Sequence, residues 1–480
     1  MKKQAFNPYL PSWEYVPDGE PYVFDGRVYV YGSHDRFNGH VFCMNDYVCW
    51  SAPVDDLGNW RYEGVIYKRT QDPRNTDGHM VLYAPDVTVG PDGRYYLYYV
   101  LDKVNIVSVA VCDTPAGQYE FYGYVRYQDG QLLGEREGDD PQFDPGVITE
   151  NGLTHLYTGF CPAADESRSG VMHTVLGSDM LTIEKEPVFV IPSAHLAKGS
   201  GFEGHEFFEA SSIRKRGDTY YFVYSSVVMH ELCYATAKDL DSNSFTYGGV
   251  VISNCDLHID SYKPADKPMF YCLNNHGSII EINGQWYVFH HRHTNGTVYS
   301  RQGCAEKISF RDDGSIIQAH LTSCGLNDGP LKGEGYYPAA IACNLFCGNE
   351  SIYSGGKGGI GIMMNSEFPR ITQDGRDGDE EEQYVANMTN TSTAGFKYFD
   401  LKDSYVKSVR IRSYGTGVIE VRTKWNGKVI GTAPVENTNF WTDVPVEIKI
   451  PKGADSLYFT FNGFGCPDFG GFELAKYTNN

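Results

Sequence analysis

Five residues that could carry acid–base chemistry recur at matching positions along this 480-residue chain. Each precedes a strand-like run and a glycine turn, and the five are Asp18, Asp86, Asp144, Glu209 and His276. Two carboxyl groups facing one substrate can cleave a glycosidic bond, because one protonates the leaving oxygen while the other activates water or attacks the sugar. Crowded carboxyls also raise one another's pKa, which keeps an acid protonated near neutral pH. The pattern therefore indicates sugar hydrolysis.

The leading residues belong to five internal repeats, each with a strand-like run, a glycine turn and an aromatic strand. The turn glycines are Gly26, Gly93, Gly152, Gly217 and Gly284. The leading residue lies eight positions before its glycine in four copies and seven positions before it in the copy with Asp86, which leaves the register of Asp86 open. Each repeat is long enough for one four-stranded blade and a functional loop.

Five such repeats predict an all-β fold that begins with a five-bladed β-propeller. The first strand of each blade lines the central channel, so the starts of these strands converge at one end of it. We therefore expect the five leading residues to cluster. The alternative is that they are hairpin-entry residues with a purely structural role, since Asp is common at turns.

Composition restricts the partners and the compartment. The formal net charge of −21 argues against a nucleic-acid or anionic-membrane partner, because phosphate binding needs clustered Lys and Arg. No apolar run follows Lys2 and Lys3, and no stretch approaches the ~20 apolar residues of a membrane span. The twelve cysteines are scattered, and we interpret them as buried free thiols. These features predict a cytoplasmic protein with neither a nucleic-acid nor a membrane partner.

Five motifs, in this order, resemble those of glycoside hydrolase family 43 over residues 6–325. They are Asn7-Pro8 followed by Asp18, Tyr-Ala-Pro-Asp-Val at 83–87, Phe-Asp-Pro-Gly-Val at 143–147, Phe-Glu-Ala-Ser at 208–211 and His-Gly-Ser at 276–278. The sequence departs from the family pattern at Tyr83, where many members have Trp, which alters the floor of the sugar pocket.

The resemblance implies an inverting mechanism with Asp18 as the general base, Glu209 as the general acid and Asp144 as the residue that orients Glu209 and keeps its pKa high. It also implies substrate contacts for Asp86, His276 and Arg301. Tyr83 and Phe208, aromatic residues expected at the channel mouth, would offer apolar faces to a sugar ring. Asp86 has a structural role as its alternative. The family implies no required cofactor, but His276 is expected to border either a structural calcium ion or a water-filled channel.

A histidine cluster, His290, His291 and His293, lies near the predicted fifth blade. Strand alternation places His291 and His293 on one face and His290 on the other. We interpret them as ordinary polar strand residues, with a metal or substrate role as the alternative.

The repeats end near Asn327–Pro330, which predicts a propeller domain at 1–326 and a β-sandwich, jelly-roll-like domain at 337–480. Strands are expected at 405–411, 417–425, 443–450 and 456–461, and the acidic loop 374–382 is expected to be solvated. This part resembles carbohydrate-binding module family 6. Trp425, Phe440 and Trp441 are its candidate sugar-stacking residues, with core packing or propeller contact as the alternative. The module is also expected to shape the rim of the site.

These observations predict an exo-acting hydrolase that releases α-L-arabinofuranosyl and/or β-D-xylosyl residues from hemicellulose oligosaccharides. An endo-arabinanase and a galactofuranosidase of the same fold are alternatives. So is a non-catalytic sugar-binding propeller, although the retained acids argue against it.

Overall fold

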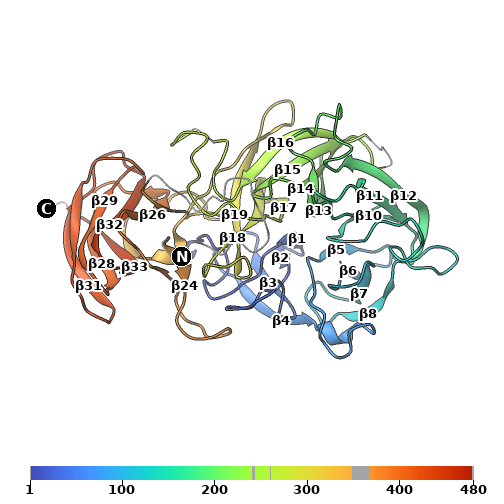
Figure 1. The fold of residues 1–480 in the computed structure, drawn as a ribbon, viewed down its shortest axis with the longest axis horizontal. Helices are drawn as coiled ribbons and strands as arrows, with labels where there is room; N and C mark the ends of the chain where they lie inside the picture. Colours follow the sequence, from blue (N-terminus) through green and yellow to red (C-terminus); the bar gives the residue numbers. More distant parts are fainter. Residues whose placement is uncertain (1, 241–243, 260, 349–367, 478–480) are drawn as a thin grey trace.

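The chain folds into a β-propeller followed by a β-sandwich, as predicted (Figure 1). The computed structural model describes residues 2–240, 244–259, 261–348 and 368–477. Over these residues the propeller contains five four-stranded sheets, each with its strands in sequential order. In Figure 1 the propeller runs from blue to yellow on the right and the sandwich is orange and red on the left.

The first two blades each pair four successive antiparallel strands. Blade 1 contains β1 (Glu20–Phe24), β2 (Arg27–Tyr31), β3 (Tyr47–Pro53) and β4 (Arg61–Tyr67). Blade 2 follows the short 3-10 helix η1 (Arg69–Gln71) and contains β5 (Asp86–Val89), β6 (Tyr95–Tyr99), β7 (Ser108–Cys112) and β8 (Glu120–Tyr124).

The other three blades repeat this arrangement. Blade 3 contains β9 (Gly146–Glu150), β10 (Leu153–Thr158), β11 (Gly170–Leu176) and β12 (Ile183–Pro192). Blade 4 contains β13 (Phe207–Arg216), β14 (Thr219–Ser226), β15 (Glu231–Ala237) and β16 (Thr246–Ser253). Blade 5 contains β17 (Ser278–Ile282), β18 (Gln285–His293), β19 (Arg301–Phe310) and β20 (Ile316–Ile317).

Around the channel β5 contacts β9, β9 contacts β13, β13 contacts β17, and β17 contacts β1. The hydrogen bond from Tyr22 of β1 to Asp86 of β5 at 2.6 Å closes the ring. The N-terminal segment reinforces the closure. The side-chain amide of Asn7 donates to the carbonyl oxygen of Ala305 on β19 at 3.0 Å and to Glu306 Oε1 at 2.8 Å. The starts of the five inner strands therefore meet around one channel.

The length of the turn between the first two strands of a blade explains why the spacing of the leading residue differs in blade 2. Phe24 pairs with Arg27, and Ile282 with Gln285, so two-residue turns join these strands. In blade 2 the last residue of β5, Val89, pairs with Tyr95, so residues 90–94 form a longer loop. Counting back six residues from the end of β1 or β17 gives Asp18 or His276, but the same count from Val89 gives Tyr83. Tyr83, and not Asp86, therefore holds the leading position in blade 2.

The sandwich consists of two facing sheets. The larger contains β22 (Gly335–Pro338), β24 (Arg370–Thr372), β25 (Tyr384–Ala386), β28 (Ser404–Arg412), β31 (Thr442–Lys449) and β33 (Asp468–Lys476). The smaller contains β23 (Asn344–Cys347), β26 (Ser392–Lys397), β29 (Thr416–Arg422), β30 (Gly431–Val435) and β32 (Ser456–Phe464). β21 (Leu331–Lys332) precedes the first sandwich strand and pairs in parallel with β27 (Phe399–Asp400), which lies between β26 and β28 in sequence. The 3-10 helix η2 (Ala339–Ile341) follows β22.

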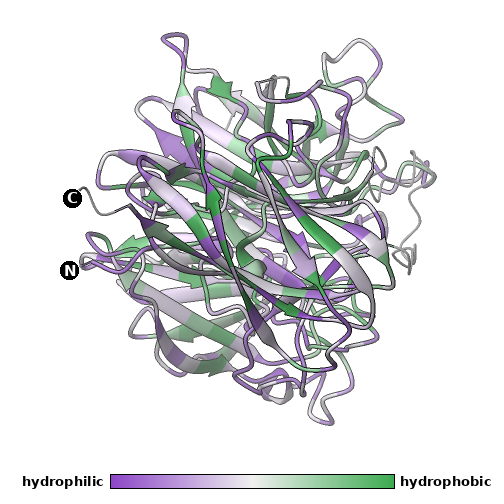
Figure 2. Cartoon of the chain, turned by 90° about the vertical axis from the view of Figure 1, so that its left-hand side faces the viewer, coloured by the Kyte–Doolittle hydropathy of each residue, from purple (hydrophilic) through white to green (hydrophobic). Residues whose placement is uncertain are grey.

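Hydrophobic and hydrophilic residues alternate in bands along the sandwich strands that face the viewer in Figure 2. The inward-facing side chains, such as Val409, Phe459 and Phe472, form one core between the two sheets. That core continues into blades 4 and 5 through residues such as Leu232 and Ile308. The two domains are thus packed together, and the limits 1–326 and 337–480 stay a prediction.

The cysteine prediction is wrong in part. Cys255 and Cys272 form a disulfide that closes a 17-residue separation. The other ten are free, and four of these are only half-buried: Cys112, Cys324, Cys347 and Cys466. The spacing of Cys255 and Cys272 carries no motif, so their proximity comes from tertiary folding alone. Within the described ranges, no helix is long and apolar enough to cross a membrane.

Candidate active site

Asp18 lies two residues before β1 and is 2% exposed. Its Oδ1 accepts a hydrogen bond from Arg301 Nη1 at 2.8 Å, and His291 Nδ1 lies 3.0 Å from the same oxygen. Burial alone would raise the pKa of Asp18, but the charge of Arg301 and the contact with His291 outweigh it and hold the pKa well below its usual value. Asp18 is therefore an ionised carboxylate at neutral pH.

Arg301, the first residue of β19, is fixed from behind by Asp35. Arg301 Nε donates to Asp35 Oδ2 at 2.9 Å and Arg301 Nη2 donates to Oδ1 at 3.0 Å. The backbone N–H of Cys43 donates a hydrogen bond to the same Asp35 Oδ1 at 2.9 Å. This fork-to-fork geometry aims the remaining nitrogen, Nη1, at Asp18. Sequence reasoning missed Asp35, because nothing in its local sequence links it to a residue 266 positions away.

Asp144 and Glu209 form the second part of the site. Asp144 Oδ2 accepts from the backbone N–H of Ala210 at 3.0 Å, which places the carboxylate beside Glu209. Burial raises the pKa of both groups, and the charge of Asp18 raises both further. The negative charge of Glu209 acts on Asp144 in the same direction. A carboxyl held protonated thus lies across from the ionised Asp18.

The backbone is unusual at each of these acids. Asp18 and Asp144 have positive φ values of 58° and 42°, and Ala210 has a φ of 70°. Glu209 lies in an irregular stretch of β13, where the pairing with β14 shifts register on both sides of it. Bulges and positive φ re-aim side chains and concentrate at functional sites. The backbone is therefore irregular at the starts of blades 1, 3 and 4, where the three acids lie.

His276, two residues before β17, lies between the acids. Its Nδ1 is 3.4 Å from Asp144 Oδ2 and 4.0 Å from Asp18 Oδ1. Burial lowers the pKa of His276 to about 4, so the ring is neutral. Calcium takes about six to eight oxygen ligands. Among the described residues, the carboxylates that lie within 4.0 Å of His276 are these two, and Asp18 is already paired with Arg301. These residues therefore do not build a calcium shell from protein oxygens.

Aromatic rings continue from blade 2 to blade 4 beside the acids. The ring centroids of Tyr83 and Phe143 are 5.1 Å apart, those of Phe143 and Phe160 are 4.9 Å apart, and those of Phe160 and Phe208 are 5.3 Å apart. We call these four residues the aromatic arc. Tyr83, Phe143 and Phe160 are half-buried, whereas Phe208 is buried behind them. The first three can offer apolar faces to a sugar ring, and Phe208 supports Phe160.

A second aromatic pair lies beside Arg301. Phe42 covers the guanidinium carbon of Arg301 at 4.8 Å from the ring centroid, and Tyr299 packs edge-on against Phe42 at 4.8 Å. Both rings are half-buried. Sequence reasoning missed Phe42 as well, because it lies in a loop between β2 and β3 outside the repeat pattern.

Asp86 departs from the expected cluster. It is fully buried as the first residue of β5, and its oxygens accept from Tyr22 Oη at 2.6 Å and from the N–H groups of Val87 and Val147 at 2.7 and 2.8 Å. Arg214 Nη1 lies 4.0 Å from it. The longer hairpin of blade 2 accounts for the shifted register. The geometry supports the structural alternative for Asp86 and offers nothing for its predicted sugar contact.

The histidine cluster divides as alternation predicted. His291 and His293 share one face of β18, with ring centroids 5.3 Å apart. Both hydrogen-bond Asn274, through its carbonyl oxygen and its side-chain oxygen respectively, each at 2.8 Å. The contact of His291 with Asp18 gives it a place in the site, which our interpretation as an ordinary strand residue did not foresee. His290 lies on the opposite face, in a small internal cavity.

The candidate stacking residues of the sandwich are mostly occupied. Trp425 lies beyond the end of β29 and takes a cation–π contact from Lys267 of the propeller segment, at 4.9 Å. Trp441 contacts Tyr384 and the guanidinium groups of Arg410 and Arg412. Phe440 alone is open, with 67% of its surface exposed. The packing alternative therefore holds for the two tryptophans.

The acidic loop is not wholly solvated. Asp377 Oδ1 accepts from the backbone N–H of Phe37 at 2.7 Å, and its Oδ2 accepts from Asn45 at 3.1 Å. Phe37 and Asn45 flank the segment that carries Phe42. The sandwich therefore reaches the blade 1 loop that borders Arg301.

Comparison with known proteins identifies the family. The model of glycosyl hydrolases family 43 matches residues 16–316. The chain is 68% identical to a xylosidase/arabinosidase of Thermoclostridium stercorarium over 475 residues, 99% of this chain and all of that protein. The structure of RS223 β-xylosidase is similar over 66% of this chain and 99% of its own, at 25% identity and a TM-score of 0.51.

The two-domain arrangement also has a solved counterpart. A family 43 arabinoxylan arabinofuranohydrolase from Bacillus subtilis covers 98% of this chain and 97% of its own, with a TM-score of 0.51 at 20% identity, which shows a shared fold. Taken with the acids at the propeller channel, the family model and the full-length relative show that this chain belongs to glycosyl hydrolases family 43.

Proposed function

We propose that this enzyme is an inverting, exo-acting hydrolase that releases α-L-arabinofuranosyl and/or β-D-xylosyl residues from hemicellulose oligosaccharides. The observation that carries the proposal is the opposite state of two carboxyls in one site. Arg301 keeps Asp18 ionised, whereas burial and the charge of Asp18 keep Glu209 protonated. The xylosidase/arabinosidase name of the 68% identical relative supports the choice of sugars.

These states match the two halves of an inverting hydrolysis. Glu209 gives its proton to the glycosidic oxygen as the bond from that oxygen to the anomeric carbon breaks. A water molecule attacks the same carbon from the opposite face, and Asp18 takes the proton that this water loses. Asp18 ends protonated and Glu209 ionised, and exchange with solvent restores both. Asp144 acts on Glu209 by position and charge.

The neighbouring residues would bind and orient the sugar. Tyr83 lies at the blade 2 position equivalent to Asp18 and contributes its half-buried ring to the aromatic arc. Phe208 would act indirectly, through Phe160. Arg301 and the neutral ring of His276 lie beside the acids and can donate hydrogen bonds to sugar hydroxyls.

A calcium ion beside His276 remains part of this proposal as a structural ion and not as a requirement for activity. Because the described side chains provide few free oxygens there, water would supply most of its ligands. No step of the reaction above passes through it.

We further propose that the sandwich is a module of the family 6 carbohydrate-binding type that now mainly shapes the rim of the site. The packed state of Trp425 and Trp441 and the contact of Asp377 with the blade 1 loop support this role. We also propose a cytoplasmic location, which the ten free cysteines among the described residues support.

A substrate screen combined with NMR tests the function. Aryl α-L-arabinofuranoside, β-D-xyloside and β-D-galactofuranoside should be compared with linear arabinan, and we expect the first two to be cleaved. Proton NMR of the first-formed sugar should show the inverted anomer. Release of the retained anomer would refute the roles of Asp18 and Glu209, and preferential internal cleavage of arabinan would favour the endo-acting alternative.

A further inference from the structure

Glu231, the first residue of β15, has a fully buried carboxylate whose two oxygens are treated differently. Oε1 accepts three hydrogen bonds: from His205 Nδ1 at 2.6 Å, from Ser226 Oγ at 2.6 Å and from Cys233 Sγ at 3.3 Å. Oε2 is buried and has no hydrogen-bond partner among the described residues. A buried carboxylate oxygen left unpaired is costly, so this atom calls for a ligand.

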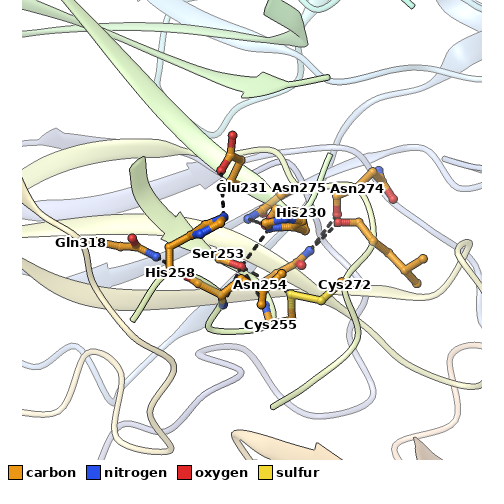
Figure 3. Close-up of a disulfide and its surroundings, with 12 residues drawn as sticks. His230, Glu231, Ser253, Asn254, Cys255, His258, Cys272, Asn274, Asn275 and Gln318 are labelled. Atoms are coloured by element: carbon orange, nitrogen blue, oxygen red, sulfur yellow. Dashed lines mark hydrogen bonds and ion pairs between the residues drawn. A yellow bond between two sulfur atoms is a disulfide. The ribbon is translucent and has the colours of Figure 1, made fainter. Parts of the chain in front are cut away.

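Two histidines lie on the side of this unpaired oxygen. His258 Nε2 is 4.0 Å from Glu231 Oε2, and His230 directly precedes Glu231 (Figure 3). One potential ligand atom from each of the three residues lies within 4.8 Å of the other two. His230 and Glu231 are buried, whereas the side chain of His258 is 56% exposed. The cluster is thus anchored inside and open to solvent at one corner.

The surroundings hold His230 in place. Its Nδ1 lies 3.0 Å from Ser253 Oγ, which fixes the ring and leaves Nε2 as the free nitrogen (Figure 3). The backbone N–H of Asn254 donates to the carbonyl oxygen of His230 at 2.9 Å. Metal-binding histidines characteristically hydrogen-bond through the second ring nitrogen, and metal-binding carboxylates through the second oxygen. Both features are present here without any contribution from the catalytic acids.

We propose that His230, Glu231 and His258 form a binding site for a divalent transition-metal cation, with Zn²⁺ as the best match. Two imidazole nitrogens and one carboxylate oxygen are a donor set typical of zinc, and a fourth, open position would be taken by water at the exposed side of His258. Calcium is a poor match, because it needs many more oxygens. The alternative trio of His205, Glu231 and Cys233 is already satisfied internally at Oε1.

The cation would tie two segments together at the edge of the catalytic pocket. His230 lies in the turn between β14 and β15 and Glu231 begins β15, whereas His258 lies in the segment closed by the Cys255–Cys272 disulfide. Ser226, which supports Glu231, follows Ser225, the strand partner of Glu209. Metal binding would therefore stiffen the wall of blade 4 next to the general acid, without contacting the substrate.

Direct metal binding tests this site. Protein stripped with EDTA and freed of the chelator should be titrated with Zn²⁺ by calorimetry, and we expect one tight site per chain. His258→Ala removes a ligand at the surface, where folding should be unaffected, and should weaken Zn²⁺ binding at least about tenfold. Glu231→Gln should weaken it too. Thermal unfolding should show a Zn²⁺-dependent rise in Tm in the unmodified protein that is absent from His258→Ala.

A matched control and a second metal complete the test. His79→Ala removes another exposed histidine, which pairs with Asp77 and is distant in sequence from His230, Glu231 and His258. This substitution should leave Zn²⁺ binding unchanged. Co²⁺ bound in place of Zn²⁺ should give visible absorption that His258→Ala abolishes, whereas excess Ca²⁺ should not displace it. The proposal is overturned if the unmodified protein binds no Zn²⁺, or if His258→Ala binds Zn²⁺ as tightly as the unmodified protein does.

Discussion

Arg301 Nη1 donates to Asp18 Oδ1 at 2.8 Å, a contact that joins the fifth blade to the first across the catalytic pocket. The pair sets the electrostatics of the whole site. The positive charge of Arg301 keeps Asp18 ionised, and the resulting negative charge of Asp18 in turn raises the pKa of Glu209. The pKa values of the proposed base and the proposed acid are therefore linked.

Replacing Arg301 with Gln should move the acidic limb of the kcat/KM profile to higher pH. Activity requires ionised Asp18, and loss of the guanidinium charge raises the pKa of Asp18. Arg301→Lys retains a charge and should shift the limb less. The profiles should be measured with an aryl glycoside, and an acidic limb that stays in place in Arg301→Gln would contradict the pairing.

Removing Glu209 should separate good leaving groups from poor ones. Glu209→Ala should nearly abolish cleavage of natural oligosaccharides but spare much of the activity on an activated aryl glycoside, whose leaving group needs little protonation. Asp18→Ala should depress both alike, because every substrate needs the water. General acid–base help is worth about 10²–10⁴-fold, so the contrast is measurable. Equal losses on both substrates in Glu209→Ala would show that Glu209 is not the acid.

Asp144→Asn should shift the basic limb of the pH profile to lower pH. The substitution removes a carboxyl that becomes negatively charged beside Glu209 as the pH rises, but it keeps an oxygen that can accept from the N–H of Ala210. The pKa of Glu209 then falls, and the enzyme loses its protonated acid earlier as the pH rises. Thermal unfolding serves as the control, since a fold left intact should keep its Tm near that of the unmodified enzyme.

Arg214→Met should destabilise the fold without changing substrate preference. Arg214 donates to Glu20 and lies 4.0 Å from Asp86 in the interior of the channel, so its loss leaves two buried acids without their cation. Breaking such a buried pair costs about 3–5 kcal/mol in the free energy of unfolding, which urea denaturation measures. Arg94→Met is the matched control, because its pairing with Asp92 is at the surface and its loss should matter far less.

Calcium and zinc should act at separable places. After chelation, added Ca²⁺ should raise the Tm of the unmodified enzyme modestly, and His276→Ala should lose that response while keeping the response to Zn²⁺. His258→Ala should show the reverse pattern. An enzyme whose Tm does not respond to Ca²⁺ would favour the water-filled channel beside His276.

The internal repeats made most of the propeller fold predictable from the sequence. Turn glycines and leading acids at a constant distance predicted the blades and the meeting of Asp18, Asp144 and Glu209, because a propeller brings equivalent strand ends to one point. Asp86 shows the limit of counting. Its hairpin is longer than the others, so the distance to Gly93 differs from that in the other repeats and does not fix the leading position.

Other residues had no local signal at all. Asp35 and Phe42 lie in a loop between strands, and their contacts with Arg301 exist only after the ring closes. His291 reads as one polar residue in an alternating strand, and only the neighbouring blade shows what it faces. The same holds for Cys255 and Cys272, which are brought together by a loop whose path the sequence does not specify.

The contact between the first and last blades also determines when the site can form during biosynthesis. Asp18 and Arg301 are 283 residues apart, so a ribosome that adds about 5–20 residues per second needs roughly 15–60 s to make the second after the first. Until then Asp18, the proposed general base, has no cation beside it, and the inner strand β1 has no β17 to contact. A nascent chain that stalls before blade 5 therefore carries all three acids and is expected to be inactive.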